Sequence, residues 1–278
     1  MFQKNFMDVL LIIKSVIMGV VEGLTEFLPI SSTGHLIVAG RLLAFPERIS
    51  TSFEIFIQLG AILAVLVFFA KDLISLIQRA IKRERGAINL LVAIAIAFVP
   101  AALVGLAFRT QIKTLLFNPV SVSIALILGG IVMLLAERIV ANRKPLLTSI
   151  DTIGPKEAAA IGAAQVLSLI PGTSRSMTTI MGGLLVGLDR ITATRFSFYL
   201  SIPTLGIATV YELSKEYKSI TGPDFLVFVI GAVVSFGVAL AVIRFFLGYI
   251  AGHTFKGFGW YRVVAGTLML LFFAPIFK

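Results

Sequence analysis

The chain has 278 residues, of which 58% are hydrophobic and 14% are charged, and its mean hydropathy is +1.01. This composition excludes an ordinary soluble domain and is typical of proteins that cross a membrane several times. The absence of cysteine excludes disulfides, thiol chemistry and cysteine-based metal sites. The formal net charge is +10, but the basic residues lie in short segments between apolar stretches. We therefore expect them to set membrane topology and to contact anionic lipid, with no nucleic acid partner.

Apolar stretches of spanning length predict an all-α polytopic membrane protein. Two further apolar regions, 7–43 and 157–188, are interrupted by the polar segments PISSTGH and PGTSRS. Because backbone groups in hydrocarbon must be hydrogen-bonded internally, such segments need protein or a water-filled cavity around them. Each region is therefore predicted to form a re-entrant helical hairpin, and the first is expected to belong to the fold because no small-residue cleavage site follows it. The uninterrupted stretches are 53–70, 88–108, 119–137, 196–213, 225–247 and 260–277.

The two halves of the chain are similar to each other. A shift of 142 positions aligns Pro29 with Pro171, Ser32 with Ser174, and ERISTS (47–52) with DRITAT (189–194). One position further, Phe53 aligns with Phe196 and Phe56 with Tyr199. We interpret this as an internal repeat, about 7–140 and 150–278, within a single integral membrane domain of residues 1–278. Each repeat has one re-entrant hairpin and three transmembrane helices, an odd number of crossings, so we predict two repeats of inverted topology, as in many transporters.

Basic residues are distributed unevenly among the predicted loops. Segments 71–87, 138–156 and 244–262 are rich in Lys and Arg, whereas 109–118 and 214–224 each hold two such residues. Arg262 is assigned to the last of the basic segments. The positive-inside rule places the basic segments in the cytoplasm and both termini outside. The first hairpin then opens outward and the second inward.

Glu22 and Glu26 lie one helical turn apart, just before the first polar segment. Two ionised carboxylates at that separation repel each other, so either they share a proton or a cation lies between them. Carboxylates inside a membrane are energetically costly and usually functional. The alternative is that the helix ends at the membrane interface, where water solvates the pair.

Hydroxyl and imidazole groups follow this pair at Ser31, Ser32, Thr33 and His35. His35 has the chemistry of an acid, a base or a nucleophile near neutral pH, and a structural role is its alternative. Ser31 and Ser32 are candidate nucleophiles and, equally, candidate caps of a following helix.

The second polar segment contains Thr173, Ser174, Arg175 and Ser176 after a Pro-Gly turn. Turn amides, a helix N-terminus, hydroxyls and an Arg are groups that bind a phosphate. A positive-inside anchor would explain Arg175 alone, but not the turn or the hydroxyls. We expect the two segments to meet near the membrane centre, where the first supplies carboxylates and His35 and the second supplies the cation.

Other motifs carry less information. Glu54 and Gln58 are candidates to line the same cavity, with side-chain packing as the alternative. No Walker-type P-loop, zincin motif, GxSxG elbow or Rossmann fingerprint occurs, so the sequence does not support nucleotide-driven transport.

EGLTEFLPISSTGH, followed later by PGTSRS, resembles the motifs of the undecaprenyl-diphosphate phosphatase family, bacterial membrane enzymes associated with bacitracin resistance. The resemblance extends over the whole chain. It implies hydrolysis of the prenyl diphosphate to the monophosphate and inorganic phosphate, which recycles the lipid carrier for peptidoglycan synthesis. It also implies a divalent cation, Mg²⁺ or Ca²⁺, and a location in the bacterial plasma membrane with the site toward the outer face. A homodimer is left open.

By this resemblance the family's carboxylate motif corresponds to Glu22 and Glu26, its serine-rich turn to Ser31 and Ser32, its histidine to His35, and its arginine motif to Ser174, Arg175 and Ser176. We expect catalytic roles for Glu22, Glu26, Ser32, His35 and Arg175, and substrate binding by Ser31, Thr33, Thr173, Ser174 and Ser176. We expect Arg175, the turn at 173–176 and a metal near Glu22 and Glu26 to neutralise the diphosphate. Ser32, His35 or a water is the nucleophile, and Glu26 or His35 accepts its proton. The alternative is a lipid-phosphate transporter, because inverted repeats specify a membrane-centre site and not its activity.

Overall fold

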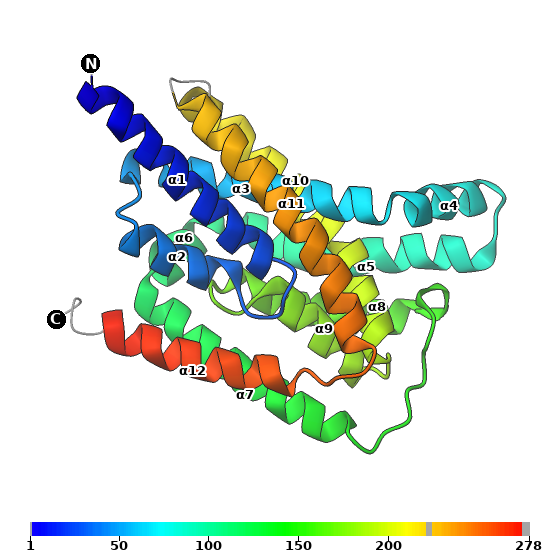
Figure 1. Cartoon of the computed structure of the whole chain (residues 1–278). Helices are drawn as coiled ribbons and strands as arrows, with labels where there is room; N and C mark the ends of the chain where they lie inside the picture. The colour runs from blue at the N-terminus through cyan, green and yellow to red at the C-terminus, as the bar shows by residue number, and fades with distance from the viewer. Residues whose placement is uncertain (1, 221–223, 274–278) are drawn as a thin grey trace.

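The computed structural model of the chain describes residues 2–220 and 224–273, and its regular structure there is helical (Figure 1). The longer helices are α1 (Phe2–Thr25), α3 (Glu47–Phe68), α5 (Arg85–Ala107), α7 (Pro119–Val140), α10 (Arg190–Ile220), α11 (Phe225–Ile250) and α12 (Lys256–Phe273). The shorter helices are α2 (Ser32–Leu42), α4 (Ala70–Ile81), α6 (Arg109–Leu116), α8 (Pro155–Val166) and α9 (Arg175–Leu185). Two 3-10 turns, η1 (Ile150–Thr152) and η2 (Leu167–Leu169), complete the described elements.

Four helices in the described part of the chain are long and apolar enough to cross a membrane: α3, α5, α7 and α11. They coincide with four of the six predicted spans and confirm a polytopic membrane protein. The other two predicted spans, 196–213 and 260–277, lie in α10 and α12, and residues 274–277 fall outside the described residues. Both helices carry charged and hydroxyl side chains that lower their hydropathy, and several of these side chains are buried, among them Ser197 in α10 and Arg262 in α12.

Two segments that the sequence assigned to loops form short helices instead. The basic segment 71–87 contains most of α4, and 109–118 contains α6. Helix α4 is amphipathic: Leu76 is buried, while Asp72 and Arg79 form ion pairs with Arg195 and Asp151 at the surface. A one-sided apolar stripe is enough to fold such a segment against a neighbouring helix, although it is too polar to enter hydrocarbon.

The two broken segments have similar backbone conformations. Helices α2 and α9 are both 11 residues long. Each follows a serine with positive φ, 72° at Ser31 and 74° at Ser174. These serines are 143 positions apart, so the backbone pairs Ser31 with Ser174. The sequence alignment, with its shift of 142 positions, had paired Ser32 with Ser174. In the structural register Ser32 corresponds to Arg175, each being the first residue of its helix.

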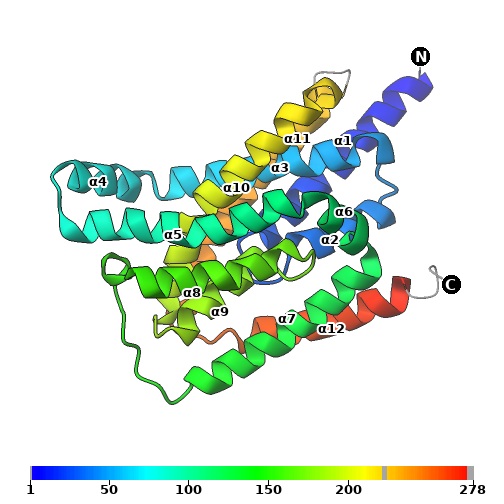
Figure 2. The ribbon, with the colours of Figure 1, turned by 180° about the vertical axis from the view of Figure 1, so that it is seen from behind.

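Helices of the two halves pack against each other across the molecule. Helix α1 packs against α11, α8 against α5, α3 against α10, and α7 against α12 (Figures 1 and 2). Glycines permit the closest approaches: a Cβ on Gly19 would lie 2.5 Å from the carbonyl oxygen of Gly231, and one on Gly162 would lie 2.8 Å from that of Ala97. Close packing on small residues is the usual way in which membrane helices associate. The halves are therefore interlocked.

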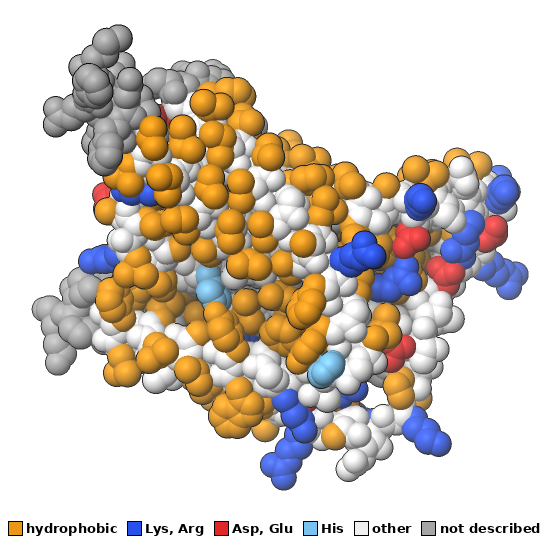
Figure 3. Space-filling model, viewed as in Figure 1, with side chains coloured by type: hydrophobic (Ala, Val, Ile, Leu, Met, Phe, Trp, Pro, Cys, Tyr) orange, Lys and Arg blue, Asp and Glu red, His pale blue; other side chains and the backbone are white. Residues whose placement is uncertain are grey.

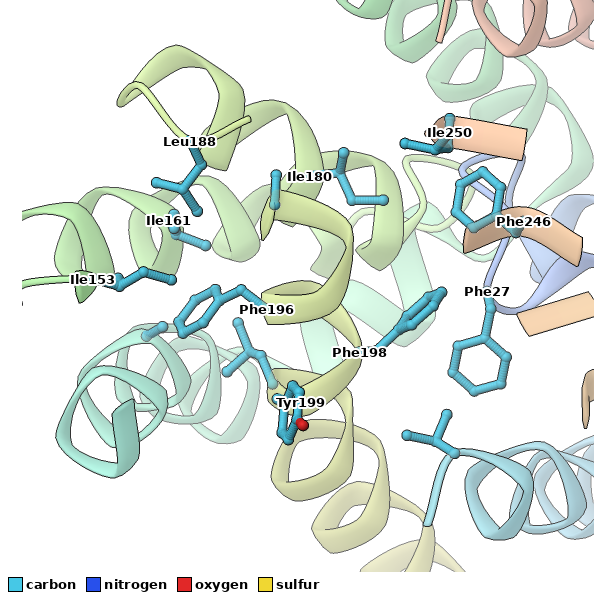
Figure 4. Packing of buried hydrophobic residues seen from close by; sticks show 14 of the residues in the cluster. Phe27, Ile153, Ile161, Ile180, Leu188, Phe196, Phe198, Tyr199, Phe246 and Ile250 are labelled. Atoms are coloured by element: carbon cyan, nitrogen blue, oxygen red, sulfur yellow. The ribbon is translucent and has the colours of Figure 1, made fainter. Parts of the chain in front are cut away.

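The main apolar core is centred on α10. Its Phe196, Phe198 and Tyr199 contact side chains from α8, α9 and α11, and Phe198 meets Phe27 edge-on with ring centroids 5.5 Å apart (Figure 4). Phe27 follows Glu26 directly in the chain, and Phe198 follows Ser197. Close packing in this core therefore fixes the backbone beside both polar residues.

Charge and apolar surface are separated along the molecule. Hydrophobic side chains cover most of the face in Figure 3, and Lys and Arg gather at the end formed by α4 and the linker after α7. Helix α1 begins and helix α12 ends toward the opposite end (Figure 1). This distribution agrees with the uneven spread of basic residues in the sequence.

Replacement of Gly19 tests the interlocking of the halves. A methyl group there would press on a backbone oxygen that cannot move away by itself, so we expect Gly19→Ala to destabilise the fold by about 1–3 kcal/mol. The measurement is thermal unfolding of the purified protein in detergent. The control is Gly248→Ala, whose Cβ meets nothing within 4 Å. Equal melting temperatures for the two variants would contradict the close α1–α11 contact.

Candidate functional site

Two proline-containing turns bring helix N-termini into the middle of the protein. Helix α1 ends at Thr25 before Pro29, and η2 ends at Leu169 before Pro171, because proline cannot donate the next helical hydrogen bond. New helices then begin at Ser32 and Arg175. The serine before each of them has a positive φ, which is uncommon for a residue with a side chain and is concentrated at functional sites.

Glu26 is the point where the two turns meet. Its Oε2 accepts a hydrogen bond from Ser32 Oγ at 2.6 Å, and its Oε1 accepts one from Arg175 Nη2 at 3.3 Å. The Glu26 and Arg175 side chains are each only 6% exposed, so little water screens the pair. One carboxylate therefore contacts the candidate nucleophile of the first segment and the cation of the second.

The Arg175 guanidinium is fixed by helix α10. Nη1 donates to Ser197 O at 3.1 Å and Ser197 Oγ at 3.3 Å, and Ser197 Oγ is 2.7 Å from Thr179 Oγ1. The guanidinium carbon lies 5.8 Å from the Phe27 ring centroid, a distance at which a cation is attracted to the ring. Nε is buried and has no hydrogen-bond partner among the residues that the structure describes. Buried donors are almost always satisfied, so this atom favours an acceptor from a ligand.

A polar cavity of about 220 Å³ opens between the turns. Its lining comes from both turns, from α3 and from α10: Glu26, Ser31, Ser32, Thr33, Gln58, Ser168, Leu169, Pro171, Gly172, Ser174, Arg175, Thr204, Leu205 and Ala208. Hydroxyls, two helix N-termini and one guanidinium, together with the Glu26 carboxylate that this guanidinium contacts, thus surround a space large enough for a phosphate group. This combination attracts an anion.

The cavity unites six of the ten predicted site residues: Glu26, Ser31, Ser32, Thr33, Ser174 and Arg175. Glu22, His35, Thr173 and Ser176 do not line it. Ser176 is buried and donates to Leu28 O at 2.9 Å, which ties the second segment to the first turn. Gln58 does line the cavity, whereas Glu54 Oε1 accepts from Ser50 Oγ at 3.0 Å outside the lining.

Glu22 is buried rather than solvated at an interface. Its side chain belongs to a residue that is 1% exposed, and its Oε1 has no hydrogen-bond partner in the protein. The described part of the chain has no cluster of three His, Asp or Glu side chains that would enclose a metal ion. Magnesium usually takes one or two carboxylates and completes its coordination with water and substrate phosphates. Glu22 and Glu26 fit that donor set.

His35 faces away from the cavity. Its Nδ1 is 2.7 Å from Ser31 O and its Nε2 is 2.6 Å from Tyr261 Oη. A carbonyl oxygen can only accept, so Nδ1 carries the hydrogen and, in the neutral ring, Nε2 accepts from the tyrosine hydroxyl. Both nitrogens are therefore engaged. The structure gives His35 a contact with the backbone of the Ser31 turn and none with Ser32.

Capping separates the roles of the serines. Ser174 Oγ accepts from the Met177 amide at 3.3 Å and caps α9, whereas Ser31 makes no such bond to α2. Ser32 is inside its helix and bonds Glu26 instead. Helix capping therefore explains Ser174 and leaves Ser32 as the hydroxyl engaged with a carboxylate.

Several contributors to the site were missed from the sequence. Ser197, Thr204 and Ser168 lie in stretches with no recognisable motif, and they approach the cavity or Arg175 through tertiary packing. Arg262 was assigned to a basic loop, but it lies inside α12, is fully buried, and donates to carbonyl oxygens of both turns. Its only sequence signal is an arginine at the start of an otherwise apolar stretch.

The fold and the site define a class: a helical membrane protein whose two interlocked halves meet at a cavity lined by polar side chains of both turns. Residues 15–268 match the family described as bacitracin resistance protein BacA, and the chain belongs to that family. This confirms the resemblance found in the sequence.

Relatives of similar length extend the comparison. The chain is 49% identical over 257 residues to undecaprenyl-diphosphatase 1 of Chromobacterium violaceum, which covers 92% of this chain and 94% of that protein. It is 49% identical over 270 residues to undecaprenyl-diphosphatase of Albidiferax ferrireducens, with 95% and 96% covered. The undecaprenyl-diphosphatase of Neisseria gonorrhoeae is 43% identical over 265 residues, again with 95% and 96% covered.

A double-mutant cycle tests the ion pair that joins the halves. Arg175→Met leaves the Glu26 carboxylate buried without its cation, which typically costs about 3–5 kcal/mol of stability. We expect Glu26→Gln combined with Arg175→Met to recover much of this loss in thermal unfolding. Arg48→Met, which breaks a pair whose arginine side chain is 63% exposed, is the control and should cost at most about 1 kcal/mol. Strictly additive losses in the cycle would contradict a direct Glu26–Arg175 interaction.

Proposed function

We propose that the chain is a membrane phosphatase that hydrolyses undecaprenyl diphosphate to undecaprenyl phosphate and inorganic phosphate. One observation carries this proposal: in a cavity of about 220 Å³, Glu26 is bonded at once to the Ser32 hydroxyl and to the Arg175 guanidinium. Family membership and the names of the relatives support the same activity. The product would return to the cell as the lipid carrier for peptidoglycan synthesis, and its supply would confer bacitracin resistance.

Ser32 is the nucleophile in this proposal and Glu26 is its base. The 2.6 Å bond between Ser32 Oγ and Glu26 Oε2 is within the range over which a base takes a proton. Ser32 Oγ bonds the terminal phosphorus, its proton passes to Glu26, and the anhydride P–O bond breaks to release the lipid monophosphate. Water then attacks the phosphoserine, and inorganic phosphate leaves. His35 takes no part in proton transfer, because both its nitrogens are engaged elsewhere.

Arg175 and the two helix N-termini stabilise the phosphoryl group during transfer. Phosphoryl transfer depends chiefly on positioning and on neutralising charge. The Arg175 Nε is a buried donor without a protein partner, and the first residues of α2 and α9 line the cavity. When phosphate oxygens enter, Arg175 can donate to them while Nη1 keeps its bonds to Ser197.

A divalent cation, Mg²⁺ or Ca²⁺, is part of this proposal. Glu26 in the cavity lining and Glu22 outside it would hold the ion. The buried Glu22 Oε1, which has no hydrogen-bond partner, supports this assignment. The ion would neutralise charge on the diphosphate when bound.

We propose an inverted repeat for the two halves, with both termini outside the bacterial plasma membrane and the cavity reached from the outer face. The exchanged packing of α1 on α11 and α8 on α5 supports two related halves. The gathering of Lys and Arg at the α4 end, away from the start of α1, supports that orientation (Figure 3). The prenyl tail of the substrate would remain in the bilayer. Formation of a homodimer also remains a prediction.

Phosphate release by the purified protein tests the activity and the nucleophile together. In detergent with added Mg²⁺ or Ca²⁺, the wild type should release inorganic phosphate from undecaprenyl diphosphate, and a chelator should stop the release. Ser32→Ala should lower the rate by at least about 10³-fold, because removing a nucleophile removes a covalent route. Ser214→Ala, which loses an exposed hydroxyl bonded only to Tyr211 O, is the matched control.

Two outcomes would contradict this account. Turnover that survives in Ser32→Ala would replace the serine by water as the nucleophile. A folded wild type that returns its substrate intact while moving it across a vesicle membrane would be a transporter with the same fold.

A further inference from the structure

The side chain of Arg262 is an unusual buried cation. The residue is 0% exposed, and it forms no ion pair with any described carboxylate. Its donors go to backbone carbonyl oxygens instead: Nη1 to Pro29 O at 3.2 Å, and Nη2 to Gly172 O and Thr173 O, both at 3.0 Å. Burial of a guanidinium without a carboxylate costs free energy of folding, and its hydrogen bonds to carbonyl oxygens offset part of that cost. The same hydrogen bonds fix the position of the backbone that carries these oxygens.

The three carbonyl oxygens belong to the two turns of the site. Pro29 lies in the first turn, two residues before Ser31, and Gly172 and Thr173 lead directly into Ser174. Ser31 and Ser174 are the positive-φ residues from which α2 and α9 begin. The planar guanidinium of Arg262, whose donors point in two directions like a fork, thus bridges the two backbone segments that carry Ser32 and Arg175.

The neighbouring residue of α12 supports the same turn. The Tyr261 hydroxyl contacts His35 Nε2 at 2.6 Å, and His35 Nδ1 contacts Ser31 O at 2.7 Å. Two consecutive residues of α12 therefore stabilise the first turn. Tyr261 acts on Ser31 O through His35, and Arg262 binds Pro29 O directly. These bonds stabilise a backbone conformation that a serine adopts rarely by itself.

Helix α7 leaves room for the guanidinium by means of Gly129. A Cβ at this position would overlap Arg262 Nη2, and would lie 3.0 Å from the end of the Met177 side chain. Both neighbours are the far ends of flexible side chains, so a methyl group here would displace the guanidinium with little change to the backbone.

We propose that Arg262 is a positioning residue for phosphoryl transfer, which sets the spacing between Ser32 and Arg175 through the carbonyl oxygens of both turns. It does not line the cavity. The inference rests on the proposed phosphatase activity and assigns that activity a residue from outside the two motifs. Because a misplacement of about 1 Å can cost about 10²-fold in rate, loss of the fork should reduce kcat.

The experiment compares Gly129→Ala with Gly237→Ala, a glycine in α11 whose Cβ meets nothing within 4 Å. The readouts are kcat and KM for phosphate release from undecaprenyl diphosphate, together with thermal unfolding. We expect Gly129→Ala to lower kcat by about tenfold or more, to change KM little, and to stay folded at the assay temperature, so that the loss of kcat exceeds any loss of folded protein relative to Gly237→Ala. Arg262→Gln should lower kcat further, and Arg262→Lys should recover part of the loss because it keeps the charge but not the fork.

The other outcomes each overturn a defined part of the account. Unchanged kcat in folded Gly129→Ala and Arg262→Gln, with an active wild type, would overturn the positioning role. A rise in KM with kcat preserved would make Arg262 a binding residue, and a fall in melting temperature that matches the fall in kcat would make it structural only. If Arg262→Gln does not fold, the kcat, KM and thermal unfolding of Gly129→Ala alone test the positioning role. A wild type that releases no phosphate would refute the proposed function itself.

Discussion

A buried ion pair between the two halves of the chain is the constraint on which the site depends. Glu26 comes from the turn after α1 and Arg175 from the start of α9, and neither charge has much access to water. In a medium of low dielectric constant each charge needs the other, so the halves must associate before either segment is stable. The same contact places the Ser32 hydroxyl and the cation on one carboxylate.

The surrounding helices are arranged to hold this pair. Helix α10 bears Ser197, which fixes the Arg175 guanidinium, and Phe198 packs on Phe27 beside Glu26. Helix α12 bears Arg262, which reaches both turns. These polar contributions explain why α10 and α12 are less hydrophobic than the four clear spans, although both are helical. Polar side chains within such helices face the protein interior, as is usual inside membranes.

Local patterns were sufficient to predict much of the fold and half of the site. Runs of apolar residues predicted the four clear spans, and proline next to hydroxyls predicted both turns, including Glu26, Ser32 and Arg175. At the turns the backbone pairs Ser31 with Ser174, one residue away from the pairing of Ser32 with Ser174 in the sequence, because Ser31 and Ser32 are alike in sequence and only the positive φ distinguishes them. Arg262 could not be assigned from the sequence, since its partners are backbone oxygens of distant turns that no side-chain pattern reveals. His35 was grouped with the carboxylates by proximity in the chain, whereas the direction of α2 turns it toward Tyr261.

The central claim is that one phosphate is held by residues of both halves in the cavity around Glu26. The most direct measurement is an experimental structure with a non-hydrolysable prenyl diphosphate bound, in which the bridging oxygen is replaced by a methylene group. The account predicts the terminal phosphonate within hydrogen-bonding distance of both Ser32 Oγ and the Arg175 guanidinium. A diphosphate bound at the basic end near α4, or in contact with only one of the two turns, would contradict it.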